Sequence, residues 1–210
     1  MRMRRKRQLD NRIKRCEHLL ITKPEELRGR WLDEFCFKEL HLELGCGKGL
    51  FTVEAAKSEP DLLLVALEKV SNVLVIALER ANDAGLNNVR YINKLADDLD
   101  TFFGESEVSR IYINFCDPWP ANRHKKRRLT GERFLVLYKQ VLRQGGEIHF
   151  KTDDLPLFEF SLEELERCGF SLTDVTYDLH EKEPVGIMTD YEVKFFESGM
   201  PIFRCVALKR

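Results

Sequence analysis

Short apolar runs alternate with segments of helical periodicity along most of the chain. The apolar runs, which are typical of buried parallel strands, are residues 39–44, 62–67, 89–92, 110–115 and 147–151. The helical segments start at Pro24 and recur at residues 50–58, 70–84, 131–142 and 157–167. Two last extended segments, 171–179 and 202–208, are placed to close the sheet as an antiparallel pair. This alternation predicts a three-layer α/β fold with a mostly parallel, seven-stranded sheet.

The length of 210 residues and the hydrophobic content of 43% fit one globular domain with a sizeable core. We expect a basic, flexible arm over residues 1–15 and a single domain over residues 16–210. No apolar run reaches the roughly 20 residues needed to cross a bilayer, and no apolar segment follows the basic N-terminus as in a secretion signal. The sequence therefore predicts a cytoplasmic protein without a membrane partner.

The formal net charge of -1 hides a strong asymmetry along the chain. Residues 1–15 carry eight Lys/Arg against one acid, and residues 123–128 carry five more. Residues 151–200, in contrast, hold 13 Asp/Glu and four Lys/Arg. Such a chain can present a positive surface to a polyanion, which favours nucleic acid as a partner. The charge alone fits a frayed basic tail and one solvated loop equally well.

The six cysteines contain no C-x-x-C pair, and no histidine stands near them at metal-ligand spacing. We therefore expect no metal site. In a protein without an export signal, the cysteines should be reduced thiols that serve as small packing residues.

A glycine-rich loop follows the first strand, where the ligand crevice of such a sheet is expected. Gly45, Gly47 and Gly49 alternate shortly after the acidic residue Glu43. The dinucleotide fingerprint would need glycine at position 50, and a P-loop would need Ser or Thr after its lysine, but the chain has neither. An acid here would also repel phosphate. The loop therefore favours a ligand that carries a positive charge or an amine.

Glu68 ends the second strand, at a position where an acid can accept hydrogen bonds from ribose hydroxyls. A ligand with a ribose, a positive centre and an amine matches S-adenosylmethionine. We predict that its sulfonium and ammonium lie against Glu43 and the glycine turn, and that its ribose lies on Glu68. A turn that simply opens a helix, beside a surface glutamate, is the competing interpretation.

The fourth strand runs into Asp117-Pro118-Trp119-Pro120, where two prolines fix φ and hold the acid at the mouth of the crevice. Trp119 offers a flat face on which a base can stack. A carboxylate, an aromatic ring and a basic loop this close together favour a nucleobase site with a phosphate clamp beside it. The alternative is a proline-rich strand exit with a solvated loop.

Together these segments resemble the bacterial tRNA (guanine-N7)-methyltransferase family. The resemblance is carried by residues 43–49, 114–120, 123–129, 150–153 and 189–192, and it extends from near residue 30 to the end of the chain. Its most distinctive part is D-P-W-P followed by R-H-x-K-R-R-L. The resemblance implies a single-domain, Rossmann-like class I methyltransferase fold, with S-adenosylmethionine as cofactor and tRNA as partner. The implied reaction is methyl transfer to N7 of guanine 46 in the tRNA variable loop.

The functional positions of the family map onto this chain residue by residue. Asp117 matches the active-site acid, which also contacts the cofactor. The other cofactor-binding positions are Glu43, Gly45, Gly47, Gly49, Glu68, Leu95, Ala96 and Asp97. The RNA-contacting loop corresponds to Ala121, Asn122, Arg123, His124, Lys125, Lys126, Arg127 and Arg128, and the guanine-binding positions to Asp153, Thr189, Asp190, Tyr191 and Glu192.

Two positions depart from the family pattern. The family usually has an acid where this chain has Leu95, and that acid binds the adenine amino group. Here either the backbone at 95–96 holds adenine alone or Asp97 substitutes for the acid. The family also often has lysine where this chain has Ala121, which weakens one substrate contact.

Two other functions stay open at this point. D-P-W-P loosely resembles the acid-Pro-Pro-aromatic motif of enzymes that methylate adenine or cytosine amines, although the order Pro-Trp-Pro and residues 189–192 disfavour this. Leu95 and Ala121 would suit a tRNA-binding protein with weakened catalysis. The sequence is compatible with a monomer or a homodimer.

Overall fold

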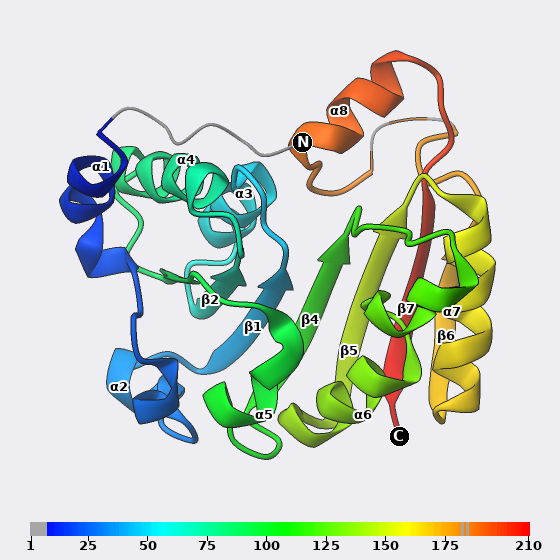
Figure 1. Cartoon of the computed structure of the whole chain (residues 1–210), viewed down its shortest axis with the longest axis horizontal. Coiled ribbons are helices and arrows are strands. Elements are labelled where there is room, and N and C mark those ends of the chain that lie inside the picture. Colours follow the sequence, from blue (N-terminus) through cyan, green and yellow to red (C-terminus); the bar gives the residue numbers. More distant parts are fainter. Residues whose placement is uncertain (1–7, 182, 184) are drawn as a thin grey trace.

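The computed structural model describes residues 8–181, 183 and 185–210, which form one seven-stranded sheet in the order β3-β2-β1-β4-β5-β7-β6 (Figure 1). The strands are β1 (Glu39–Leu44), β2 (Leu62–Leu67), β3 (Val89–Ile92), β4 (Val108–Asn114), β5 (Leu142–Thr152), β6 (Phe170–Thr176) and β7 (Phe203–Lys209). Strands β1 to β5 are parallel, and β7 runs antiparallel to both β5 and β6. The predicted sheet, with its antiparallel closing pair, is confirmed.

Helices cover both faces of the sheet, which gives three layers (Figure 1). The helices are α1 (Leu9–Arg15), α2 (Trp31–Phe35), α3 (Leu50–Ser58), α4 (Ser71–Asp83), α5 (Leu99–Phe102), α6 (Glu132–Val141), α7 (Leu155–Arg167) and α8 (Asp190–Glu197). Odd-numbered residues of β2 pack in the hydrophobic cluster that contains α6 and α7, and even-numbered ones pack with α3 and α4. Burial on both faces is the arrangement that a continuous apolar run predicts.

Helix α1 lies within the basic arm that the sequence predicts over residues 1–15. Leu9 is buried, and Arg12 Nε donates a hydrogen bond to Glu79 of α4 at 2.7 Å. From Leu9 onward the arm is therefore helical and attached to the domain. The attachment comes from the buried side chain of Leu9 and from the contact between Arg12 and Glu79. Residues 1–7 lie outside the described part of the chain.

Two elements beside the crevice are not predicted by the sequence. Helix α8 begins with a capping box, in which the N–H of Glu192 donates to Thr189 Oγ1 at 3.0 Å and the N–H of Thr189 donates to the Glu192 carboxylate at 3.1 Å. Residues Asn122–Arg127 form a short 3₁₀ helix, η4. Both segments are short, and η4 has no apolar residue, so apolar periodicity over a long window does not mark them.

In the part of the chain that the structure describes, every helix is too short or too polar to cross a membrane. Among the same residues, no three or more His, Cys, Asp or Glu side chains are grouped so that they could hold a metal ion. The six cysteines are free, and Cys16, Cys46 and Cys205 are buried.

Candidate active site

The strand order reverses between β1 and β4, and the glycine loop after β1 lines the crevice that opens there. The N–H groups of Gly45 and Cys46 donate to the carbonyl of Leu67 at 2.8 and 3.0 Å, which folds the loop over the end of β2. All three loop glycines have positive φ. A Cβ on Gly49 would lie 2.6 Å from the Cβ of Ala77, so a glycine is required for α3 to begin this close to α4.

Glu43 lines the crevice from β1 and is only 2% exposed. Its carboxylate accepts hydrogen bonds from Thr52 Oγ1 at 2.5 Å and from Asn114 Nδ2 at 3.4 Å. Burial raises the pKa of Glu43 to about 7, because the two hydrogen bonds do not compensate for the lost hydration of the charged form. A cation in the crevice would favour that charged form and would be attracted by it.

Asn114, the last residue of β4, completes this end of the crevice. It is 7% exposed, and its Oδ1 has no hydrogen-bond partner among the described residues. A buried acceptor without a partner is costly, so this atom marks a place for a donor. A cavity of about 290 Å³ opens here between the glycine loop, Asn114, Phe115 and the first turn of α8.

Glu68 lies across the glycine loop at the end of β2. Its Oε2 accepts the N–H of Gly47 at 3.1 Å, and its Oε1 accepts the N–H of Val70 at 2.8 Å. Each oxygen keeps a lone pair for a ribose hydroxyl. Asn93, which the sequence analysis misses, donates from Nδ2 to the Glu68 carbonyl at 2.7 Å and accepts a hydrogen bond from Ser71 at 2.7 Å. Asn93 thereby fixes the backbone of Glu68 from the end of β3.

Leu95, Ala96 and Asp97 follow β3 at the next strand end. The Leu95 side chain is 52% exposed, and Ala96 is 9% exposed. Asp97 pairs with Arg133 of α6 at 2.7 Å. The carboxylate that could substitute for the family's acid therefore already has a partner. This favours the alternative in which residues 95–96 themselves hold adenine.

Asp117 projects from the turn after β4, two residues after Phe115, which lines the crevice. The flanking residues Phe115 and Trp119 have φ values of +52° and +44°, which are uncommon for residues other than glycine. The Asp117 side chain is 67% exposed, and its carboxylate lies 3.8 Å from Lys69 Nζ. Because Lys69 directly follows Glu68, this contact joins the segment after β2 to the segment after β4.

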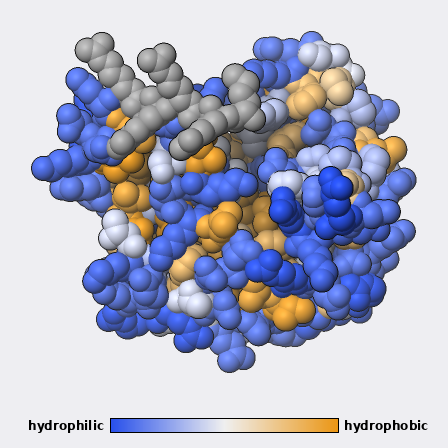
Figure 2. Space-filling view, in the orientation of Figure 1, coloured by the Kyte–Doolittle hydropathy of each residue, from blue (hydrophilic) through white to orange (hydrophobic). Residues whose placement is uncertain are grey.

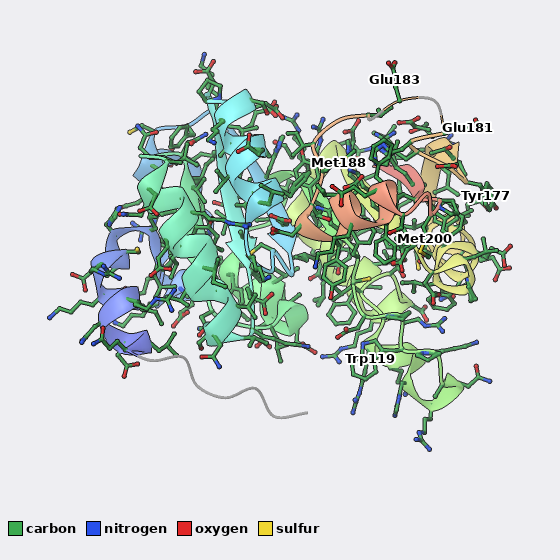
Figure 3. All side chains as sticks on the ribbon, turned by 90° about the horizontal axis from the view of Figure 1, so that it is seen from above. Trp119, Tyr177, Glu181, Glu183, Met188 and Met200 are labelled. Atoms are coloured by element: carbon green, nitrogen blue, oxygen red, sulfur yellow. The ribbon has the colours of Figure 1, made fainter. Side chains whose placement is uncertain are left out.

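The element η4 carries most of the basic loop that the sequence assigns to RNA. Its exposed residues are Asn122, Arg123, Lys125, Lys126 and Arg127, and Ala121 just before it is exposed too. Figure 2 shows strongly hydrophilic side chains gathered on this part of the surface. The guanidinium carbon of Arg127 lies 4.9 Å from the ring centroid of Trp119. The ring of His124 contacts the Trp119 ring edge-on, with 5.6 Å between the two centroids. In Figure 3, Trp119 lies apart from α8 and Met188. Its ring therefore packs against the basic loop and not against α8.

Arg128 differs from the rest of the loop because it is 6% exposed. Its guanidinium donates hydrogen bonds to the carbonyls of Pro118 and Trp119. The sequence predicts an RNA contact at this position, whereas the chain turns inward after η4 and buries the side chain.

Helix α8 forms the other wall of the crevice. Arg80 of α4 donates to both carboxylate oxygens of Asp190 at 2.7 and 2.9 Å, which ties the first turn of α8 to α4. The Tyr191 ring is 64% exposed and stacks on Phe115, with their centroids 6.3 Å apart. Asp153 is half-buried and follows β5 at the same edge of the sheet.

Glu192 is fully buried, unlike its neighbours in the same motif. Its carboxylate accepts hydrogen bonds from Lys151 Nζ at 2.9 and 3.1 Å, and it lies 2.9 Å from Nε2 of His180. The sequence predicts an acid that faces guanine, but the third residue of α8 turns toward β5 and is held inside the protein. Lys151 and His180 carry no motif signal of their own for this role.

The residues present fit S-adenosylmethionine. Its ammonium can donate to the Glu43 carboxylate and to the unpartnered Oδ1 of Asn114, and its ribose can donate to Glu68. The glycine turn leaves room for the backbone to approach the ligand. A seven-stranded sheet with this acid and glycine turn at its switch point defines a class I methyltransferase that uses S-adenosylmethionine as methyl donor.

Comparisons with known proteins identify the family. A family model described as a putative methyltransferase matches residues 38–205. The tRNA (guanine-N(7)-)-methyltransferase of Geobacillus kaustophilus (strain HTA426) is 45% identical over 211 aligned positions, which cover 100% of this chain and 97% of the relative. The protein of the same name from Geobacillus thermodenitrificans (strain NG80-2) is also 45% identical, with 100% and 98% covered. The chain belongs to the tRNA (guanine-N7)-methyltransferase family.

Solved structures with low sequence identity share the fold. The 16S rRNA methyltransferase KamB matches with a TM-score of 0.65 at 18% identity, over 88% of this chain and 91% of that one. The aminoglycoside resistance methyltransferase NpmB1 matches with a TM-score of 0.62 at 17% identity, over 90% and 95% of the two chains. These likenesses concern the arrangement of strands and helices alone.

Proposed function

We propose that this protein transfers the methyl group of S-adenosylmethionine to N7 of a guanine in tRNA, and that this guanine is position 46 of the variable loop. One juxtaposition carries the proposal: the exposed carboxylate of Asp117 stands at the mouth of a crevice whose buried end, Glu43 with Asn114, suits the methyl donor. The full-length relatives at 45% identity are named for guanine-N7 methylation of tRNA. A tRNA substrate implies a cytoplasmic enzyme, as a monomer or a homodimer.

The proposed reaction does not require the protein to remove a proton from the nucleophile. N7 of guanine has an exposed lone pair and no proton, so no general base is needed to create the nucleophile. The bound cofactor supplies an electrophilic methyl group on a positive sulfur. The contribution of the chain is then to position donor and acceptor, which can remove about 7–11 kcal/mol of the barrier. Burial raises the pKa of the Cys116 thiol to about 12, so the cysteine beside Asp117 is not a nucleophile.

Asp117 is the residue that we expect to stabilise the charge formed during methyl transfer. The purine becomes positive, and a nearby carboxylate stabilises that charge and can accept hydrogen bonds from N–H groups of guanine. Asp153 is the candidate for the Watson–Crick edge of the base, where guanine offers donors that adenine lacks. The stacked pair of Phe115 and Tyr191 gives the base an aromatic surface on the α8 side. Glu192 contributes from inside the protein, by holding α8.

Methyl transfer to unmodified tRNA transcripts tests this function. The protein should methylate a transcript with guanine 46 and fail on one with adenine at that position. Mass spectrometry of the digested product should show N7-methylguanosine. An N6-methyladenosine product would instead identify an amino-directed enzyme, and tight tRNA binding without transfer would identify a binding protein with weakened catalysis.

A further inference from the structure

The guanidinium of Arg128 lies beneath the turn that carries Asp117. Its Nε donates to the carbonyl of Pro118 at 3.0 Å, and its Nη2 donates to the carbonyl of Trp119 at 3.2 Å. The ring centroid of Phe160 in α7 lies 4.4 Å from the guanidinium carbon. Hydrogen bonds from a charged donor are stronger than those between neutral groups, so this side chain can hold the turn firmly.

The turn requires such support because its backbone is strained. Phe115 and Trp119 both have positive φ, at +52° and +44°, a conformation that is unfavourable for residues other than glycine. The N–H of Phe115 donates to the carbonyl of Lys151 at 2.9 Å, which fixes the start of the turn. Pro118 and Pro120 have no N–H, so the backbone of this turn has few donors and is held here through the carbonyl oxygens of Pro118 and Trp119.

The segment after η4 fixes Arg128 itself. Its own N–H donates to the carbonyl of Lys125 at 3.0 Å, and its carbonyl accepts the N–H of Gly131 at 3.0 Å. Thr130 is fully buried, and its Oγ1 lies 2.7 Å from Oγ of Ser161 in α7. The backbone on both sides of Arg128 is therefore anchored to η4 and, through Thr130, to α7.

We infer that Arg128 is a positioning residue for methyl transfer: it fixes the Pro118 and Trp119 carbonyls so that Asp117 stays at the mouth of the crevice, and it makes no contact with RNA phosphate. The inference rests on the proposed function. On this inference, the exposed cations of the basic loop form an outer part that binds RNA. Arg128 is an inner support, which holds the turn that carries Asp117. Arg127 belongs to the outer part, since it is exposed and lies against the Trp119 ring.

A comparison of two neighbouring arginines tests the inference. Arg128→Lys keeps the charge but loses the fork that reaches both carbonyls. It should lower kcat at saturating tRNA about 10²-fold, as a displaced reacting group does. Its KM for tRNA and its slope of log K against log[salt] should match wild type. The matched variant Arg127→Gln should raise KM and reduce the slope by about 0.9. A reduced slope or a wild-type kcat in Arg128→Lys would overturn the inference.

Chemical modification of the wild-type chain tests the same point without relying on a variant that folds. Phenylglyoxal, followed by peptide mass spectrometry, should modify Arg123 and Arg127 in the free protein, and tRNA should protect both. Arg128 should stay unmodified with and without tRNA. Modification of Arg128 in the free protein that tRNA blocks would show a phosphate contact and end the inference.

Wild-type transfer separates this inference from the proposed function. If wild-type protein methylates no tRNA, the proposed function fails. The reactivity of Arg128 toward phenylglyoxal then still decides whether the side chain is an inner support or an exposed cation.

Discussion

Glu43 is buried, and it is also the acid expected to bind the ammonium group of the cofactor. Burial disfavours its charged form in the free protein, whereas a bound cation favours that form. Burial raises its pKa to about 7, so near neutral pH the free protein holds a proton there about half of the time. A bound ammonium group favours the carboxylate form. Cofactor affinity should therefore depend on the ionisation of this single residue.

We expect S-adenosylmethionine to bind more weakly as the pH falls through about 7, and binding at or below that pH to release a proton. Glu43→Gln should bind about 10- to 100-fold more weakly at pH 8, since it loses one charge-assisted hydrogen bond, and it should release no proton. Calorimetry in two buffers of different ionisation heat measures both quantities. Identical heats in both buffers between pH 6 and 8 would contradict the role given to Glu43.

Folding stability supplies the control, because the same pKa acts on it in the opposite direction. The folded-state pKa of Glu43 lies above its unfolded value of about 4.3, so the folded state holds the proton longer. The resulting stabilisation is complete below the unfolded pKa and is lost as the pH rises through about 7. Glu43→Gln should therefore raise the Tm at pH 8 and change it little at pH 5, so its weaker binding cannot be attributed to unfolding.

Asp117 differs from Glu43 because its side chain is 67% exposed. Asp117→Asn should leave the free energy of unfolding within about 0.5 kcal/mol of wild type. It should slow single-turnover methyl transfer about 10²- to 10³-fold, because the developing positive charge on guanine loses its carboxylate. Affinity for tRNA should change little. A variant that transfers at nearly the wild-type rate would reduce Asp117 to a surface residue.

At the scale of the residue, the sequence identifies Glu43 and the glycines because their chemistry has few other uses at the end of a strand. It does not separate Arg128 from its neighbours. Five cations in a run look equivalent, and the burial of one depends on Phe160 and on two carbonyls that only the folded chain brings near. The burial of Glu192 against Lys151 is likewise visible only in the folded chain.

At the scale of the element, continuous apolar runs predict β1, β2 and β3 with the bounds that the structure has. β1 and β2 are inner strands, and three of the four residues of the edge strand β3 are buried, so burial is the dominant constraint on their sequence. Helix α8 is missed because it has only eight residues, too few for its apolar side chains to establish a helical period in the sequence. The signal that could have found it is Thr189 followed by Glu192, the spacing of a capping box.

The buried contact between Glu192 and Lys151 should hold α8 against the sheet. Glu192→Gln leaves the lysine without its counter-charge in a site where burial already lowers the pKa of Lys151. Removing one partner of a buried ion pair costs about 3–5 kcal/mol. Urea unfolding should show this loss, and hydrogen exchange should show faster opening of α8. The control is Glu197→Gln, an exposed position on the same helix. Equal stability of the two variants would show that the contact between Glu192 and Lys151 does not hold α8 against the sheet.

At the scale of the whole molecule, the net charge of -1 says less than its distribution. The exposed cations of η4 follow the turn that leaves β4, whereas residues 151–200 hold 13 of the 35 acidic residues. A polyanion is therefore drawn to the edge of the sheet where the cofactor site lies. The sequence shows the charge runs, but only the fold shows that this run follows a strand whose end lines the crevice.

Salt dependence should show whether tRNA is bound at this place or by general charge. Replacing Arg123, Lys125, Lys126 and Arg127 with glutamine should weaken binding and lower the slope of log K against log[salt] by about 0.9 for each phosphate that is no longer neutralised. Matched replacements of Lys57 and Arg143, which lie at the opposite edge of the sheet and pair with Glu54 and Glu39, should leave the slope unchanged. Fluorescence anisotropy with labelled tRNA between low and physiological salt measures both slopes. An equal reduction per charge at the two edges would mean that binding follows net charge alone, and η4 would then have no special place in recognition.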